Sequence, residues 1–421
     1  MTLLLGGIAD DFTGGLELAS IMVRDGVRTR LLTRFATSED VDGLEAAVVC
    51  LKSRVAPRNV AVKAVEDAYR ILAPHRPRQV FQKYCATFDS TPRGNIGPCA
   101  DRLMQLVGAP FTAFCPAFPA VARTVFQGHL FAFDQLISRS LKRNDPLTPM
   151  REPDLVRVLQ AQTERRVGLI RHEDLRGGTA AIEARVAWLT EQGISYAISD
   201  GADDDDLRRL AAAVIDWPLM TGGSTVCEFY APLWRERGLT RADTPPTRLP
   251  KGRGHGVVLA GSCAERTFEQ LEVFGARHPV RMIDPVASVG RVDATAEEAL
   301  AWAKPLVDRS PIAIAVSSRP EQVAALQKKL GRLAAARLAE EIMGRVAKGL
   351  AALGARKFVV AGGETSGAVL EALGVRVLDV GPYEGPGTSR AVTLGDDPMS
   401  FYLKPGKLGA IDMLERALQN S

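Results

Sequence analysis

Residues 357–367, Lys-Phe-Val-Val-Ala-Gly-Gly-Glu-Thr-Ser-Gly, combine a short apolar run with two adjacent glycines, Gly362 and Gly363. The apolar run is typical of a buried strand, and the glycines permit a sharp turn and close approach of a ligand. Thr365 or Ser366 could cap a helix over residues 368–373. A strand, a glycine turn and a helix N-terminus together predict a phosphate-binding loop, although a purely structural turn would show the same glycine pair.

Two adjacent carboxylates, Asp10 and Asp11, follow the apolar stretch 3–9. In open α/β sheets ligands bind at the carboxyl ends of the strands, where such carboxylates could orient or deprotonate a sugar hydroxyl. The alternative is that one aspartate caps the helix predicted over residues 16–25. Because Thr13 offers another cap, the sequence favours a chemical role for the pair.

A third polar stretch, residues 83–95, connects the end of one predicted strand to the start of a helix. The fork of Arg93 suits a carboxylate or phosphate, and the helix N-terminus near Asn95 adds amide donors. A solvated loop with a satisfied Arg–Asp pair would show the same pattern. The polar side chains of this stretch are Lys83, Asp89, Ser90, Thr91, Arg93 and Asn95.

Short apolar strands alternate with amphipathic helices along most of the chain, which predicts an α/β protein with largely parallel sheets flanked by helices. Residues 118–150 carry several prolines and predict a long ordered loop. Prolines and glycines also concentrate before residue 255. We therefore expect a domain over residues 1–240, a linker over 241–254 and a second domain over 255–421.

The composition excludes several classes of protein. The chain has 421 residues, 46% hydrophobic residues and a net charge of +4 without a basic block, so a nucleic-acid partner is not indicated. Its six cysteines form no Cys-x-x-Cys pair, which argues against zinc and a disulfide framework. No apolar run approaches the ~20 residues of a membrane span, and no signal peptide is evident. We expect a cytoplasmic protein without a membrane partner.

Taken together, the motifs resemble the four-carbon acid sugar kinase family over nearly the whole chain. The matching motifs are residues 9–14, 83–85, 88–91, 93–98, 116–119, 123–125, 128–131, 146–150, 221–224, 261–263 and 361–368. The chain departs from the family pattern at Ala122, Asp145, residues 225–227 and residues 405–409. Most departures lie in or at the rim of the region that the family uses to bind the sugar acid. They therefore bear on the identity of the substrate more than on the reaction type.

The resemblance implies an N-terminal acid-sugar domain and a C-terminal ATP domain. It implies phosphorylation of the terminal hydroxyl of a four-carbon 3-oxo sugar acid by ATP, with Mg²⁺ accompanying the nucleotide. Erythronate, threonate and 3-oxo-isoapionate are alternative substrates. The metal ligands are not identified, and homo-oligomer formation is left open.

The resemblance also divides the site residues between the two ligands. On the acid side it implies Asp10, Asp11, Lys83, Asp89, Arg93, Gly94 and Asn95. On the ATP side it implies Ser262, Gly362, Gly363, Glu364, Thr365 and Gly406. Asp11 or Asp89 is expected to position or deprotonate the attacking hydroxyl, with Asp11 favoured because it lies at a strand end.

Two other functions fit the βα pattern alone. An NAD-dependent dehydrogenase of small acids would need a Gly-x-Gly-x-x-Gly turn after a strand, which the sequence lacks. A non-catalytic sugar-acid sensor would not need both a carboxylate-rich pocket and a phosphate loop. The kinase remains the favoured interpretation.

Overall fold

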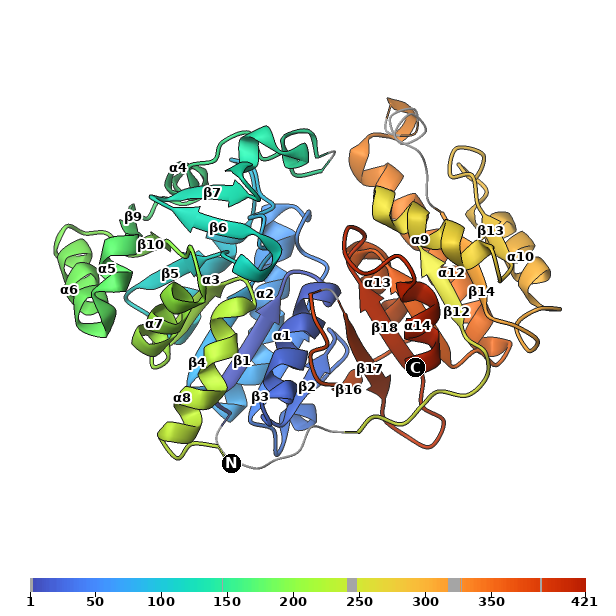
Figure 1. Cartoon of the computed structure of the whole chain (residues 1–421), viewed down its shortest axis with the longest axis horizontal. Helices are drawn as coiled ribbons and strands as arrows, with labels where there is room; N and C mark the ends of the chain where they lie inside the picture. Colours follow the sequence, from blue (N-terminus) through green and yellow to red (C-terminus); the bar gives the residue numbers. More distant parts are fainter. Residues whose placement is uncertain (1–2, 146, 241–247, 317–325, 327, 387) are drawn as a thin grey trace. The chain divides into compact units, whose positions relative to one another are not determined.

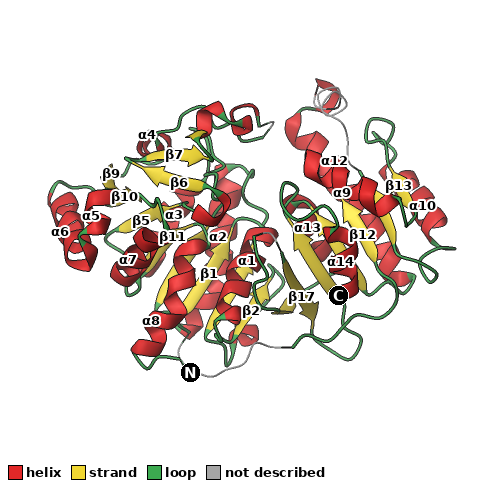
Figure 2. Ribbon diagram, in the orientation of Figure 1, coloured by secondary structure: helices red, strands yellow, loops and turns green. Residues whose placement is uncertain are grey.

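The computed structural model describes residues 3–145, 147–240, 248–316, 326, 328–386 and 388–421. The chain divides into two compact units, Met1–Pro246 and Thr247–Ser421, and each contains a run of largely parallel strands (Figure 1). Residues 241–247 of the predicted linker lie outside the described residues. In each unit, helices flank a central sheet, as Figure 2 shows, which confirms the predicted fold class.

The first unit contains a parallel sheet with the strand order β2-β3-β1-β4-β11-β5-β10-β9. Its strands read as continuous apolar runs because helices cover both faces. The strands are β1 (Leu5–Ala9), β2 (Thr29–Leu32), β3 (Ala46–Cys50), β4 (Gln79–Lys83), β5 (Thr112–Cys115), β9 (Val167–Ile170), β10 (Tyr196–Ser199) and β11 (Leu219–Gly222).

Amphipathic helices connect these strands. The sequence predicts a helix over residues 96–107, and α3 has the same bounds; the helix predicted over residues 16–25 corresponds to α1, which begins four residues earlier. The helices are α1 (Phe12–Arg24), α2 (Arg58–Leu72), α3 (Ile96–Val107), α4 (Leu155–Gln160), α5 (His172–Arg176), α6 (Gly178–Glu191), α7 (Asp204–Val214) and α8 (Tyr230–Glu236). Short 3₁₀ turns add η1 (Ser38–Val41), η2 (Ala73–His75) and η6 (Thr225–Phe229).

The prediction of a long loop over residues 118–150 is wrong. This region contains a three-stranded antiparallel sheet, β6 (Arg123–Phe126), β7 (His129–Ala132) and β8 (Gln135–Leu136). Gln127 and Gly128 form a two-residue hairpin turn, with φ of 50° and 74° at the two positions. Positive φ at both central residues matches the twist of the flanking strands. Three 3₁₀ turns complete the segment: η3 (Pro119–Val121), η4 (Ile137–Arg139) and η5 (Leu141–Asn144).

The second unit contains a sheet with the order β13-β14-β12-β15-β18-β17-β16. The first five strands are parallel, and β17 runs antiparallel to both its neighbours. The strands are β12 (Val257–Ala260), β13 (Val280–Met282), β14 (Ile312–Ala315), β15 (Lys357–Ala361), β16 (Val377–Val380), β17 (Ser389–Thr393) and β18 (Ser400–Lys404). The sequence did not indicate β17 or β18.

The helices of the second unit are α9 (Glu265–Gly275), α10 (Val292–Ala303), α12 (Arg332–Ala352), α13 (Gly363–Ala372) and α14 (Met413–Asn420). The sequence also predicts a long helical region over residues 321–353, broken near Gly331; α12 forms its second part, and residues 321–325 and 327 lie outside the described residues. The core on one face of the sheet joins α9 and α14 to strands β12, β15 and β18 through buried side chains such as Phe274, Leu414, Val359 and Tyr402. No helix among the described residues is long and apolar enough to span a membrane.

Helix α13 begins earlier than predicted. Its N-cap is Gly362, at φ 125°, and not Thr365 or Ser366. Both of those residues lie inside the helix, where the Ser366 hydroxyl donates to the Gly362 carbonyl at 2.8 Å. Glycine replaces a side-chain cap because a residue with a Cβ would be strained at this φ.

Candidate functional site

In the first unit, three neighbouring parallel strands deliver polar side chains to one edge of the sheet. The last residue of β1, Ala9, is in register with Cys50 at the end of β3 and with Lys83 at the end of β4. Asp10 and Asp11 follow β1, and Arg54 follows β3. The parallel arrangement brings these side chains together at the carboxyl edge, where α/β sheets bind ligands.

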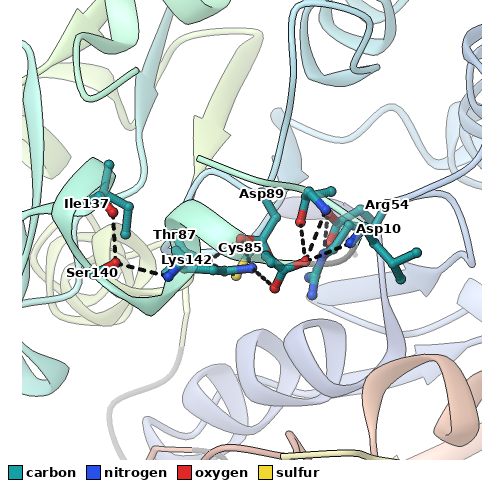
Figure 3. Close-up of polar contacts among 11 residues, drawn as sticks. Asp10, Arg54, Cys85, Thr87, Asp89, Ile137, Ser140 and Lys142 are labelled. Carbon is teal, nitrogen blue, oxygen red and sulfur yellow. Dashed lines mark hydrogen bonds and ion pairs between the residues drawn. The ribbon is translucent and has the colours of Figure 1, made fainter. Parts of the chain in front are cut away.

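Arg54 binds both aspartates that follow β1. Its Nη2 and Nε atoms donate to the two carboxylate oxygens of Asp10 at 2.7 and 2.9 Å (Figure 3). The same Nη2 lies 2.9 Å from Oδ1 of Asp11. Burial raises the pKa of Asp10 against the opposing effect of Arg54. Burial alone would lower the pKa of Arg54, but the two carboxylates outweigh this effect and raise it. The guanidinium therefore stays charged.

Asp11 also caps helix α1, which corrects the expectation that Thr13 would do so. Its Oδ1 accepts from the Gly14 amide at 2.8 Å, and its Oδ2 accepts from the Thr13 hydroxyl at 2.8 Å. Burial opposes its ionisation, but Arg54, Lys83 and these hydrogen bonds prevail and lower the pKa of Asp11. Asp11 is therefore both the cap of α1 and an ionised carboxylate at neutral pH.

Lys83 is 3% exposed, and its ammonium donates to the Tyr84 carbonyl at 2.9 Å. A Cβ built on Gly14 would lie 2.8 Å from that ammonium and 2.7 Å from Oδ1 of Asp11. Glycine at position 14 thus allows the helix start, Asp11 and Lys83 to pack against one another. Lys83 lies in the cluster that the sequence predicted.

A second ion-paired group surrounds Asp89. Oδ1 of Asp89 lies 2.6 Å from the Lys142 ammonium, which also contacts Oδ2 of Asp145 at 2.9 Å (Figure 3). Thr87 donates its hydroxyl to Asp89 at 2.6 Å. Although burial opposes ionisation, Lys142 and Arg54 lower the pKa of Asp89 to about 2. Asp89 is therefore a carboxylate at neutral pH and a weak proton acceptor.

The remaining three predicted residues of the acid side have different environments. Arg93 is exposed, and it forms no ion pair with any carboxylate among the described residues. Gly94 accepts from Arg58 through its carbonyl at 3.0 Å, and a Cβ on it would lie 1.9 Å from the Ser90 hydroxyl. Asn95 is buried and donates its amide to the Ser53 and Ala56 carbonyls at 2.7 and 3.0 Å. Asn95 therefore holds the 53–56 turn that carries Arg54.

Three basic residues of this region were not predicted from the sequence. Arg54 is distant in sequence from Asp10 and Asp11, and Lys142 is distant from Asp89, so no local pattern marks these pairs. The sequence placed Arg123 in the family motif 123–125 but indicated no role for it. It stacks on the Phe133 ring at 4.7 Å, and burial lowers its pKa against the opposing charges of Cys85 and Asp89.

In the second unit, three parallel strands again end at one edge. Ser262 follows β12, Gly362 and Gly363 follow β15, and Gly406 follows β18. The loops pack closely: a Cβ on Gly406 would lie 1.8 Å from the Ser262 hydroxyl, and one on Gly362 would lie 2.9 Å from that of Thr365. The N-terminus of α13 lies at the same edge. Small residues and a helix N-terminus form an arrangement that suits phosphate groups.

Glu364, in the first turn of α13, is half-buried at this same edge. No group of three or more His, Cys, Asp or Glu side chains in the described ranges could hold a metal ion.

Comparison with known proteins assigns a type to each unit. Residues 5–229 match the model of a sugar-binding N-terminal domain, and residues 257–414 match that of a nucleotide-binding C-terminal domain. The chain is 43% identical over 418 residues to a 3-oxo-tetronate kinase of Pseudomonas fluorescens, covering 99% of this chain and 96% of the relative. This chain belongs to the four-carbon acid sugar kinase family.

A second curated relative and a solved structure show the same full-length similarity. A 3-oxo-tetronate kinase of Burkholderia multivorans is 43% identical over 99% of this chain and 97% of its own length. A solved structure of a tRNA synthase candidate from Salmonella typhimurium LT2 aligns with TM-score 0.81 at 34% identity, over 99% of this chain and 98% of that one. Membership of this family places the protein among kinases, which are phosphotransferases.

Proposed function

We propose that this protein uses ATP to phosphorylate the terminal 4-hydroxyl of a four-carbon 3-oxo sugar acid of the 3-oxo-tetronate type. The observation that carries the proposal is the full-length match, at 43% identity, to relatives named 3-oxo-tetronate kinase. The paired strand-end sites support it, because one offers carboxylates to hydroxyl groups and the other offers amides to phosphates. A cytoplasmic location, with a small sugar acid and ATP as partners, is part of the same proposal.

On the acid side, the charges suggest how a sugar acid would bind. Arg54 and Lys142 are each shared between two carboxylates, so neither provides a spare charge for the substrate carboxylate. The exposed Arg93 does have a charge available. We therefore propose that Arg93 binds the carboxylate of the sugar acid. The carboxylates of Asp10, Asp11 and Asp89 would accept hydrogen bonds from the substrate hydroxyls.

Asp11 is assigned to the attacking hydroxyl. Phosphoryl transfer depends mainly on alignment and on charge neutralisation, and it demands little of a base. A carboxylate with a lowered pKa suits a positioning role, because it stays ionised while it accepts the hydroxyl hydrogen bond. Asp89, also with a lowered pKa, is the alternative residue for this role.

On the nucleotide side, Ser262, Gly362, Gly363, Glu364, Thr365 and Gly406 are assigned to ATP. The close packing of Gly406 on Ser262 leaves no room for larger side chains at this edge. Backbone amides of α13 would donate to phosphate oxygens, and Mg²⁺ bound with the nucleotide would neutralise charge on the transferred group.

Three alternatives remain for the substrate and one for the reaction. Erythronate, threonate and 3-oxo-isoapionate share the acid and hydroxyl groups that the site could recognise. An NAD-dependent sugar-acid dehydrogenase is disfavoured by the family assignment.

A thermal-shift screen of ATP, NAD and a panel of sugar acids tests the proposal. We expect ATP with Mg²⁺ and a 3-oxo-tetronate each to raise the melting temperature, because ligands that bind only the folded state stabilise it. A shift with NAD and none with ATP would overturn the kinase assignment.

A further inference from the structure

A buried lysine that belongs to none of the motifs described above ends the central strand β18. Lys404 is 0% exposed, although lysine is rarely fully buried without a partner. It is in register with Ala361 of β15, and its carbonyl accepts from the Gly362 amide at 2.9 Å. The lysine therefore lies directly beside the glycine turn from which α13 starts.

The Lys404 ammonium is directed at the loop that follows β18. Its Nζ donates to the Gly406 carbonyl at 3.3 Å, and the Thr267 hydroxyl of α9 donates to the same carbonyl at 2.9 Å. Gly406 in turn packs against Ser262. The positive charge thus lies behind the loops after β12, β15 and β18, at the edge that carries the N-terminus of α13.

No carboxylate in the described part of the chain forms an ion pair with Lys404. The charged group that acts on it is Arg266 of α9, which has the same sign. Burial, with a smaller contribution from Arg266, lowers the pKa of Lys404 to about 8. A buried cation without a counter-anion is costly, so its retention here needs an anion that arrives from outside the chain.

We propose that Lys404 binds the phosphate chain of the nucleotide and supplies the counter-charge that the glycine loops lack. This inference rests on the proposed function, since it names a residue of the same nucleotide site. An ammonium at the base of a glycine-rich phosphate loop acts as a point charge, a role to which lysine is well suited. A movement of the flexible side chain away from the weak 3.3 Å bond to Gly406 would bring Nζ to a phosphate oxygen.

Lys404→Met tests the inference, because methionine fills similar space without charge. Titration calorimetry of the full chain should show at least a tenfold weaker affinity for ATP and an unchanged affinity for adenosine, which has no phosphate. The free variant should melt at the same temperature as the wild type or higher, since it no longer buries an unpaired charge. Lys404→Gln provides a second neutral variant in case the methionine variant fails to fold.

Lys357→Met is the matched control. Lys357 is a half-buried lysine at the opposite, amino end of β15, so its loss should leave ATP affinity unchanged. Equal ATP affinity in wild type and both Lys404 variants would overturn the inference. So would an equal loss of ATP and adenosine affinity, which would indicate a structural role. If the wild type bound no ATP, the proposed function itself would fail, so the two failures are distinguishable.

Discussion

The three aspartates assigned to the sugar acid, Asp10, Asp11 and Asp89, differ in how their surroundings shift the pKa of the carboxyl group. Asp11 and Asp89 have lowered pKa values because basic neighbours outweigh burial, whereas burial raises the pKa of Asp10. Asp11 and Asp89 are therefore not tuned toward neutral pH in the way a strong general base would be. The residues therefore fit a kinase that works by alignment more than by proton abstraction.

Asp11→Asn should bind both ligands and lose most of kcat. Asparagine caps a helix as well as aspartate does, so α1 should remain intact, while the negative charge at the attacking hydroxyl is lost. Steady-state kinetics and ligand titration measure the two effects. Asp203→Asn is the control, because Asp203 caps α7 in the same way by accepting from the Asp206 amide at 2.8 Å. Near-normal kcat in Asp11→Asn would exclude Asp11 from this role.

Arg93→Lys should raise KM for the sugar acid about tenfold or more and leave KM for ATP nearly unchanged. The substitution keeps the charge but removes the bidentate fork. Arg76→Lys, at another exposed arginine, provides the comparison. Unchanged kinetics for the acid would show that another cation, such as the half-buried Arg123, holds the carboxylate.

Lys142→Met should destabilise the protein by about 3–5 kcal/mol at neutral pH, the usual cost of removing one partner from a buried ion pair. The pKa of Asp89 in the wild type is about 2, below its ordinary value of 3.8, so the pair stabilises the fold above pH 3.8. That contribution disappears as the pH falls through about 2. Urea unfolding at pH 7 and at about pH 2 should show a larger difference between wild type and variant at pH 7, and the opposite order would contradict this account.

At the scale of elements, local pattern predicted most of the buried parallel strands, because short continuous apolar runs bounded by turn residues are typical of strands buried on both faces. It failed for β6–β8, where prolines before and after the hairpin concealed the Gln127–Gly128 turn. It also missed Arg54 and Lys142, whose partners are brought together only by tertiary folding. The helix caps were misassigned because Asp11, Thr13, Gly362 and Thr365 are all acceptable near a helix start, and only packing decides between them.

The glycine turn before α13 gives an element-scale prediction. Gly363→Val should abolish ATP binding, because a branched side chain at the first position of α13 obstructs approach to the backbone amides. Binding of the sugar acid should persist, since its proposed residues belong to the other unit. Calorimetric titration with each ligand, on protein shown to be folded by circular dichroism, is the measurement. Normal ATP affinity, or loss of both ligands, would contradict the division of residues proposed here.

At the scale of the whole molecule, the two units match different family models, one sugar-binding and one nucleotide-binding. Composition excluded a basic nucleic-acid surface but could not select a substrate. Asp145, one of the positions where the chain departs from the family pattern, binds Lys142, which also binds Asp89. Side-chain contacts of this kind are set by folding, so the sequence alone leaves the substrate undecided.

The most direct test of the central proposal is the identity of the phosphorylated product. The protein would be incubated with ATP, Mg²⁺ and, in turn, a 3-oxo-tetronate, erythronate, threonate and 3-oxo-isoapionate, with ADP release and phosphorus NMR as readouts. We predict the highest kcat/KM for the 3-oxo-tetronate, with a phosphate monoester on its 4-hydroxyl and one ADP per product. A clear preference for erythronate or threonate would contradict the 3-oxo assignment, and no phosphorylated product from any acid would contradict the kinase itself.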